Sequence, residues 1–534
     1  MRKIAVIVLI IALGLTGCIG DRFSPDNQQE QQTEPSFEEP TLEGGSINLS
    51  MGIPATLNPL LNTDETVDRV LKLVFEPLFY RDENFRPRSD MIESYFYDDS
   101  GTLLTLNLKD GLRWQDGTSI KASDIVYSMD VISASDEGAY YKGVLTNISS
   151  YAAIDNKTLK IWFYYPFSEN LNYLNFPVIP AHYYRSSGNK GSGNNMIPMG
   201  SGVYTCKSYV PAGELILEKT TNCYGQTAFI DEIHVSFNID STAEIFGLNQ
   251  GSLDCAKALI TQLSSFSASN VKANEYYSSY YDFVAFNFKN NLLSNENIRK
   301  AIAHCLNKDS ILENIYLNRA IATSSPFHPN SWIYNNDLSQ YNYDLSAARN
   351  FLDDAGFIVS GEGIRVNDGA TLSLSIIANK ENKERTQIAQ SLGAELRSVG
   401  FDIDVEILEF GEFNNRISSG NFDMAICGWE FSQALDIRLL FSSSQISDGL
   451  NFISYSDSEM DRLLELAGNS YTDSDIMINY YNLQQYINSK LPYLSIAFRN
   501  GALLTNNKIL GNINPLEHNL YNGIKDWYII TEET

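Results

Sequence analysis

The most constraining feature of this sequence is a hydrophobic pattern over residues 372–407 that changes its period twice. Residues 372–376 alternate as in a half-buried strand, residues 388–399 repeat apolar side chains at helical spacing up to Gly400, and residues 401–407 alternate strictly again. A strand, a helix and a second strand in this order form a β-α-β unit with parallel strands and a right-handed crossover. The pattern therefore predicts an α/β fold.

A further helix, around residues 412–418, and a further strand, residues 422–427, follow this unit. The strand leads into Gly428-Trp429-Glu430-Phe431-Ser432, and ligands of open α/β sheets bind at the carboxyl ends of the strands. Trp429 is our first candidate for a ligand contact, because an indole offers a broad apolar platform with one donor. The alternative is that Trp429 is an ordinary core residue.

The length and charge of the chain limit its organisation and its partners. A chain of 534 residues exceeds what one hydrophobic core supports, so we expect two lobes or more. Its 43% hydrophobic and 19% charged residues are typical of a globular protein. The formal net charge of −27 argues against nucleic acid or an anionic membrane surface as a partner, because both would repel the chain.

The N-terminal region has the pattern of an export signal and a tether. A charged start and the apolar run 4–15 are typical of a signal peptide and too short for a spanning helix. Thr16-Gly17-Cys18 resembles the bacterial lipoprotein cleavage box, so we expect residues 1–17 to be removed and Cys18 to carry lipid that anchors the protein outside the cytoplasm. Residues 18–44, rich in Gln, Glu and Pro, are predicted to be a disordered tether. The alternatives are a secreted protein with an accidental Cys and an arm packed on the surface.

Shorter elements are predicted in the first part of the body. Residues 68–79 carry apolar side chains at helical spacing, and Ser123 is predicted to be the N-cap of the next helix. The predicted strands are residues 46–50, 104–108, 204–209, 214–218, 229–237 and 253–258, of which the third and fourth form a hairpin. Apart from Cys18, the cysteines are odd in number and unpatterned, so we expect most of them to be core residues rather than parts of a disulfide framework: Cys206, Cys223, Cys255, Cys305 and Cys427.

Several motifs in a fixed order resemble the dipeptide/oligopeptide-type solute-binding proteins of ABC importers, family 5. The motifs are Thr56-Leu57-Asn58-Pro59, Phe75-Glu76-Pro77-Leu78-Phe79, Leu108 to Gly117, Ala122 to Ser128, Met199 to Tyr204, Asn297 to Ile302, Ala347 to Phe357 and Pro492-Tyr493-Leu494. The resemblance implies an α/β, two-lobe periplasmic-binding-protein-like fold of class II, with an extra subdomain in the first lobe. Two crossing segments, near residues 280–285 and 492–497, would join the lobes.

The implied domains are residues 45–283 for the first lobe, with a subdomain inserted at about 83–195, residues 284–490 for the second lobe, and residues 491–534 returning to the first. The implied function is that of a membrane-anchored, extracellular, monomeric receptor that captures peptides, closes by hinge motion and delivers them to the permease subunits of an ABC importer. Open alternatives are an oligosaccharide receptor, since aromatic platforms also stack on sugars, a sensory lipoprotein on the same scaffold, and a secreted hydrolase.

Further ligand contacts are expected from the family. Relatives place an Asp three residues after the Trp to pair with the ligand's amino terminus; here that position is Ser432, and a neutral hydroxyl cannot replace the carboxylate. Glu430 or Asp436 could supply the charge instead; the alternative is that each is solvated or structural. The other candidates are Thr56 and Asn58 in the first strand-to-helix loop, Tyr281 and Phe283 on a crossing strand, and Asn451. For Asn58 the alternative is a turn-forming role before Pro59.

Signatures of catalysis and of metal binding are missing from the sequence. It contains no Gly-x-Ser-x-Gly, His-Glu-x-x-His or Cys-x-x-Cys motif and no Gly-rich phosphate loop followed by Lys. Its histidines are scattered: His182, His234, His304, His328 and His518. The pair Asp353-Asp354 on a helix is typical of a solvated face rather than of a glycosidase dyad. We therefore expect a binding protein without cofactor or metal.

Overall fold

The computed structural model describes residues 44–222, 224–237, 241–259, 270–431, 436–447 and 449–529. The predicted signal peptide, the predicted lipidation site Cys18, nearly all of the predicted tether, and Cys223 and Ser432 lie outside these residues. None of the described helices has the length and apolar character needed to cross a membrane.

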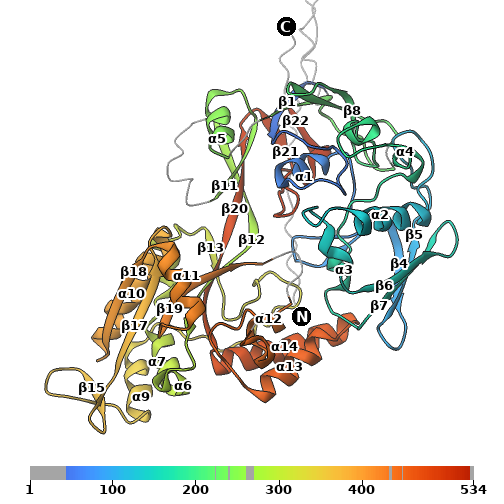
Figure 1. Ribbon diagram of the computed structural model, residues 1–534. Coiled ribbons are helices and arrows are strands. Elements are labelled where there is room, and N and C mark those ends of the chain that lie inside the picture. The colour runs from blue at the N-terminus through green and yellow to red at the C-terminus, as the bar shows by residue number, and fades with distance from the viewer. Residues whose placement is uncertain are drawn as a thin grey trace, which may run out of the picture. The chain divides into compact units, whose positions relative to one another are not determined.

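A mixed sheet forms the central part of the fold, and its two longest strands connect the halves of the body. β12 (Val271–Phe286) and β20 (Tyr493–Asn506) pair antiparallel, side by side in Figure 1. At one end β20 pairs with β11 (Cys255–Leu259), and at the other end β12 pairs with β19 (Met424–Glu430). β12 and β20 are the strands that correspond to the two predicted crossing segments. The short β13 (Ala320–Ala322) also pairs with β20.

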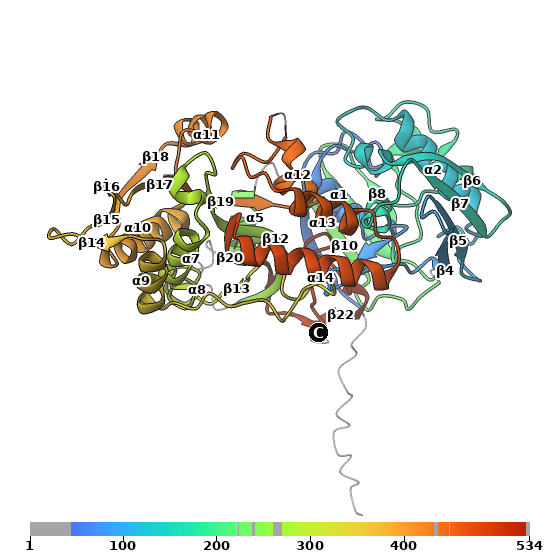
Figure 2. The ribbon, with the colours of Figure 1, turned by 90° about the horizontal axis from the view of Figure 1, so that it is seen from below.

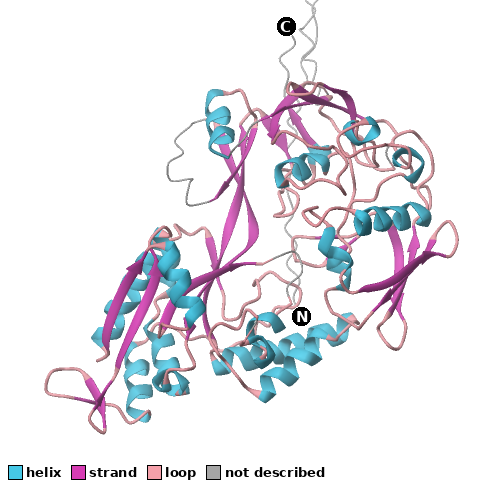
Figure 3. Ribbon diagram, in the orientation of Figure 1, coloured by secondary structure: helices cyan, strands magenta, loops and turns pink. Residues whose placement is uncertain are grey.

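The predicted β-α-β unit is confirmed in the second lobe. β17 (Ser373–Asn379), α10 (Lys383–Ser398) and β18 (Asp402–Leu408) follow one another, and the two strands pair in parallel. Because neighbouring side chains point to opposite faces of a strand, Ile376 joins a core on the α10 face, while Ile377 joins the core that contains Phe413 of α11 (Phe410–Ser419). Figure 3 shows these helices beside the sheet.

Other helices complete the second lobe. They are α6 (Asn291–Ser294), α7 (Glu296–Cys305), α8 (Lys308–Asn314), α9 (Leu345–Asp354), α12 (Arg438–Phe441), α13 (Ser458–Gly468) and α14 (Asp473–Lys490), with a small sheet β14 (Ile358–Val359), β15 (Arg365–Asn367) and β16 (Ala370–Thr371). Figure 2 shows α13 and α14 lying against each other. On α9, the side chain of Asp353 is mostly exposed and pairs with Arg365, which fits the predicted structural role.

The first lobe contains separate sheets. One has the order β1 (Ser46–Met51), β10 (Glu232–Phe237), β9 (Glu214–Lys219), β8 (Tyr204–Tyr209), and another β4 (Ile92–Tyr97), β5 (Leu103–Leu108), β7 (Thr158–Phe163), β6 (Ile148–Ala153). Smaller pairs are β2 (Tyr80–Arg81) with β3 (Pro87–Arg88), and β21 (Ile509–Gly511) with β22 (Trp527–Ile529). The helices are α1 (Glu65–Leu71), α2 (Ala122–Ala134), α3 (Asn170–Tyr173), α4 (Ala181–Tyr184) and α5 (Ser241–Gln250). The predicted hairpin is β8–β9, in which Cys206 faces Leu217.

Two predicted helix boundaries are wrong. The first helix ends at Leu71 instead of Phe79, because the carbonyl groups of Leu73 and Val74 accept hydrogen bonds from Tyr204 and Gly202 instead of continuing the helix. The second begins at Ala122, so Ser123 lies inside it. The carboxylate of Asp124 accepts the backbone N–H of Lys121 at this end.

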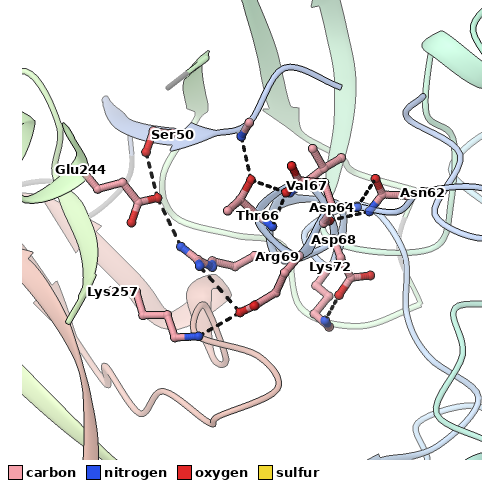
Figure 4. Close-up of polar contacts among 12 residues, drawn as sticks. Ser50, Asn62, Asp64, Thr66, Val67, Asp68, Arg69, Lys72, Glu244 and Lys257 are labelled. Atoms are coloured by element: carbon pink, nitrogen blue, oxygen red, sulfur yellow. Dashed lines mark hydrogen bonds and ion pairs between the residues drawn. The ribbon is translucent and has the colours of Figure 1, made fainter. Parts of the chain in front are cut away.

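Polar contacts hold α1 against the neighbouring elements (Figure 4). The guanidinium of Arg69 lies 3.3 Å from the carboxylate of Glu244 on α5, which also accepts the hydroxyl of Ser50 on β1. Lys257 on β11 contacts Glu65 at 2.8 Å. These contacts hold α1 against α5 and β11 and connect α5 to β1.

The hydrophobic cores divide along the two long strands. Tyr276 of β12 and Leu503 of β20 belong to the core of the first lobe, whereas Tyr281 and Phe498 belong to the second. The exact lobe boundaries stay a prediction. Of the described cysteines, Cys255, Cys305 and Cys427 are buried in the cores, Cys206 is half-buried, and all four are free thiols.

Candidate functional site

An irregularity interrupts the pairing of β12 with β20 where the cores divide. Tyr277 pairs with Asn500 and Tyr281 with Phe498, so Ser278, Ser279 and Tyr280 stand opposite Arg499 alone. Such a bulge bends and twists the strand that carries it. We call residues 277–281 of β12 and 498–500 of β20 the hinge segment. The backbone bends there between two separately packed cores.

A cavity of about 80 Å³ lies beside the hinge segment and is lined by residues from both lobes. The hinge strands contribute Ser279 and Phe498, and Phe431 follows β19. The first lobe contributes Arg81, Phe85, Pro87, Tyr95, Tyr97, Ser168, Glu169, Leu171 and Asn172, and the second contributes Pro326, Phe327, His328, Ser331, Trp332, Ile333, Tyr471, Asp473 and Ile476. A second cavity, of about 300 Å³, is also lined by Arg81 and Phe85.

Phe85, Phe431, Phe498 and His328 place aromatic rings on one wall of the first cavity, and Tyr281 packs against two of them without lining it. The ring of Tyr281 lies 5.7 Å from that of Phe431 and 5.1 Å from that of Phe498. The imidazole of His328 lies 5.0 Å from Phe498 and 4.7 Å from Phe85. Rings at these separations stabilise one another and offer an apolar surface that tolerates ligand side chains of different shapes.

Ionisable groups line the rest of the cavity. Burial lowers the pKa of the Arg81 guanidinium, and Glu517 and Glu169 oppose that effect. Burial raises the pKa of Glu169, and burial together with Arg81 lowers the pKa of His328 to about 3. Arg81 is therefore the cation and His328 a neutral ring at ordinary pH.

Glu517 connects the C-terminal segment to the hinge segment. Its carboxylate accepts the backbone N–H of Ser279 at 2.8 Å, and the Ser279 hydroxyl lies 2.9 Å from the same oxygen. The same hydroxyl lies 2.7 Å from the carbonyl oxygen of Phe431. Burial raises the pKa of Glu517. The bulge is thus tied to the segment that follows Trp429.

A buried ion cluster fixes the hinge strands on the second-lobe side. Asp282 of β12 is 0% exposed and contacts Arg385 of α10 at 2.9 Å and Arg499 of β20 at 2.5 Å. The hydroxyl of Tyr316 donates to the same carboxylate at 2.7 Å. Although burial opposes it, the two arginines hold the pKa of Asp282 below its usual range.

The predicted residues Trp429 and Glu430 lie at the end of β19. Neither they nor Asp436 line the two cavities; among the described residues of this segment, only Phe431 does. β19 extends to Glu430, three residues beyond the predicted strand, because Trp429 and Glu430 still pair with Tyr281 and Tyr280 of β12. Trp429 is half-buried, and Glu430 is exposed. Asp436 makes a two-pronged contact with Arg438, at 2.8 and 2.9 Å, which occupies its carboxylate.

The remaining predicted residues are buried within the protein. Tyr281 and Phe283 are both 0% exposed, and the Tyr281 hydroxyl bonds with Ser495. Thr56 and Asn58 both hydrogen-bond to Asn195, and the side-chain Oδ1 of Asn58 accepts the backbone N–H of Leu60, as in an Asx turn. Asn451 donates to the carbonyl groups of Ser442 and Tyr455. A role of these residues in ligand contact stays a prediction.

The sequence interpretation missed Arg81, Glu169, His328 and Glu517. These side chains come from a two-residue strand, the start of a short helix and irregular segments, which carry no periodic signal. The only sequence cue is the clustering of an isolated His328 among prolines and serines in Ser324-Ser325-Pro326-Phe327-His328-Pro329. Within the described residues, no three His, Cys, Asp or Glu side chains are grouped as a metal site.

Comparisons with known proteins give a consistent result. The family of bacterial extracellular solute-binding proteins, family 5 Middle, matches residues 86–443. The oligopeptide-binding protein AppA of Bacillus subtilis is 24% identical over 545 residues, with 98% of this chain and 97% of AppA covered. The dipeptide-binding protein of Escherichia coli is 21% identical over 486 residues, covering 84% of this chain and 88% of the relative.

Solved structures share the fold. The ABC transporter substrate-binding protein CtaP of Listeria monocytogenes is similar at a TM-score of 0.73 and 20% identity, with 92% of this chain and 100% of that chain covered. AppA of Bacillus subtilis in complex with a nonapeptide gives 0.58 and 22% identity over the same shares. The two-lobe fold, the order of the motifs and the extent of the family match lead to one conclusion: this chain belongs to family 5 of the bacterial extracellular solute-binding proteins, and it is a binding protein rather than an enzyme.

Proposed function

We propose that this protein is a monomeric, membrane-anchored receptor that captures peptides outside the cytoplasm, closes around them by bending at the hinge segment, and delivers them to the permease of an ABC importer. Lipid on Cys18 would hold it at the cell membrane. Peptide binding is supported by the relatives named above, two of which carry oligopeptide or dipeptide binding in their names.

The observation that carries the proposal is the position of the cavity. Within the described residues, one irregularity in the pairing of β12 with β20 coincides with the division of the cores, and the cavity lies beside it. Residues of both lobes line the cavity. A ligand held there contacts both lobes at once, so binding energy favours the closed arrangement. Aromatic rings along one wall give the broad apolar contact that varied peptide side chains need.

Native mass spectrometry and solution scattering test this function. The protein as purified should retain species with peptide masses, and a mixed-sequence library of three- to five-residue peptides should decrease its radius of gyration. A mixture of maltose- and cellulose-type oligosaccharides at equal concentration serves as the control. An unchanged radius with peptides, or retention of sugars instead of peptides, would contradict the proposal.

A further inference from the structure

The two cavities beside the hinge segment are neighbours that share part of their walls. Arg81 and Phe85 line both of them, whereas every other lining residue belongs to one cavity alone. A side chain that lines two cavities lies between them. Arg81 of β2 and Phe85 of the turn between β2 and β3 therefore separate a space of about 80 Å³ from a larger one of about 300 Å³.

A row of three aromatic rings crosses this division. The ring of Phe85 packs on that of His328, with 4.7 Å between the centroids, and His328 packs on Tyr277 at 4.9 Å. His328 lines the first cavity and Tyr277 lines the second. The three rings come from the first lobe, the second lobe and the hinge segment. Separation of the lobes would therefore part Phe85 from His328 and join the two cavities.

The turn between β2 and β3 holds Phe85 in an unusual backbone conformation. Its φ of +60° lies in the left-handed region, which bulky residues rarely adopt. Asp82 fixes the turn, because its carboxylate accepts the backbone N–H groups of Asn84 at 2.9 Å and of Arg86 at 3.0 Å. Glycine adopts this conformation without strain, so the shape of the turn does not require a phenyl ring at residue 85.

Both neighbours of Phe85 in the sequence are bound to the second lobe. The backbone N–H of Trp332 donates to the carbonyl oxygen of Asn84 at 3.0 Å, and the guanidinium of Arg86 lies 4.9 Å from the ring of Trp332. Arg86 also pairs with Asp473 at the start of α14. These contacts hold the ring of Phe85 in place between the cavities.

We propose that Phe85 limits the length of the captured peptide. Its ring closes the first cavity against the second, so the lobes close only around a peptide that fits on one side of the ring. A longer peptide occupies the place where Phe85 packs on His328 and prevents closure. This inference rests on the proposed peptide-binding function and adds to it a residue that determines ligand length.

The expected size of the effect follows from the geometry. The second cavity, of about 300 Å³, reaches the lower end of the range of small-ligand sites. The 4.7 Å between the centroids of Phe85 and His328 exceeds the roughly 3.3 Å that one extended residue spans. Without the Phe85 ring, at least one further residue should enter, and burial of its side chain should improve retention about tenfold.

Native mass spectrometry with peptides of graded length tests the limit. The probes are equimolar libraries of peptides with uncharged side chains and two to ten residues, one library for each length. The wild-type protein should retain peptides up to a limiting length, and longer ones about tenfold less. In solution scattering, peptides within the limit should decrease the radius of gyration, and longer peptides should leave it unchanged. Phe85→Gly should extend the limit by one residue or more.

A matched control separates the effect of the ring from that of the backbone. Phe85→Gly replaces a bulky residue in the left-handed region by glycine, and so does Leu317→Gly, where φ is +54°. Leu317 is 51% exposed and lines neither cavity, so Leu317→Gly should keep the wild-type limit. Phe85→Ala removes the ring but keeps the backbone strain, and it should extend the limit as Phe85→Gly does.

Each outcome decides the inference. Equal retention of all lengths by the wild type overturns the limit but leaves peptide capture intact. A limit that persists in folded Phe85→Gly and Phe85→Ala, or that moves as far in Leu317→Gly, overturns the role of Phe85. Scattering of the wild type needs no variant, and compaction by peptides of every length also overturns the inference. Retention of no peptide overturns it together with the proposed function.

Discussion

Glu76 shows how a single half-buried side chain affects the pH response of the first lobe. Its carboxyl group lies within hydrogen-bonding distance of the hydroxyls of Ser201 and Tyr224, in the motif Phe75-Glu76-Pro77. Burial, with Asp90 nearby, raises the pKa of Glu76 from 4.5 to about 8. The folded protein thus binds a proton that the unfolded chain has already released at neutral pH.

The sign of the resulting pH dependence follows from linkage. Stability from Glu76 is fully present below the unfolded pKa of 4.5 and is lost as pH rises through about 8. We expect the free energy of unfolding to fall by up to about 4 kcal/mol across this window, and Glu76→Gln to remove that part of the slope. Urea unfolding at pH 5 and pH 8 measures it. Glu83→Gln, at an exposed acid, should leave the slope unchanged, and a slope unaltered in Glu76→Gln would refute the assignment.

At the same scale, the sequence identified the strand end that carries Trp429 but not Arg81 and His328, which line the cavity. Trp429 follows a periodic strand, so its place at a strand end could be inferred. Arg81 and His328 come together only through tertiary folding, from segments distant in the sequence. Asp436 looked available as a free acid, yet it pairs with Arg438 two residues later, a local contact that hydrophobic periodicity does not reveal.

At the scale of elements, long periodic segments were predictable and their ends were not. The unit β17–α10–β18 was found because its pattern extends over many residues and both strands are buried on at least one face. The end of α1 was misplaced because hydrogen bonds from residues 202–204, far away in the sequence, replace the next helical turn. The bulge in β12 has no sequence signal, since Ser278-Ser279-Tyr280 also fits a regular strand.

The Asp282 cluster links three elements at the hinge, so its loss should be costly. Asp282→Asn keeps the side-chain shape but leaves Arg385 and Arg499 buried without their shared counter-charge. We expect a loss of about 3–5 kcal/mol of unfolding free energy. Chemical unfolding followed by fluorescence measures this loss. Asp404→Asn, on the exposed face of β18, is the control and should change stability little. Equal effects of both changes would show that the cluster does not stabilise the hinge.

At the scale of the whole molecule, the described lobes also meet away from the hinge. The turn between β4 and β5 contacts the connection between α13 and α14, where the Tyr471 hydroxyl donates to the carbonyl of Asp99 at 2.9 Å. Ser168 similarly lies 2.9 Å from the Tyr480 hydroxyl. A single hydrogen bond contributes only about 1 kcal/mol net to stability, so these two contacts can break and re-form as a ligand enters and leaves.

Gly101 in that turn offers a way to prevent closure without touching the cavity. A Cβ atom at Gly101 would lie 2.4 Å from the ring of Tyr471, so Gly101→Ala should force the lobes apart. Gly111→Ala is the matched control, because both glycines have φ in the left-handed region, +69° and +78°, but nothing lies within 4 Å of a Cβ at Gly111. Both variants carry the same backbone strain, about 1 kcal/mol, so strain alone cannot distinguish them. Only Gly101→Ala should weaken peptide affinity, by about fivefold, and increase the radius of gyration of the peptide-bound protein. Calorimetry and solution scattering measure the two effects, and an equal loss of affinity in both variants would show that contact at this turn is not part of closure.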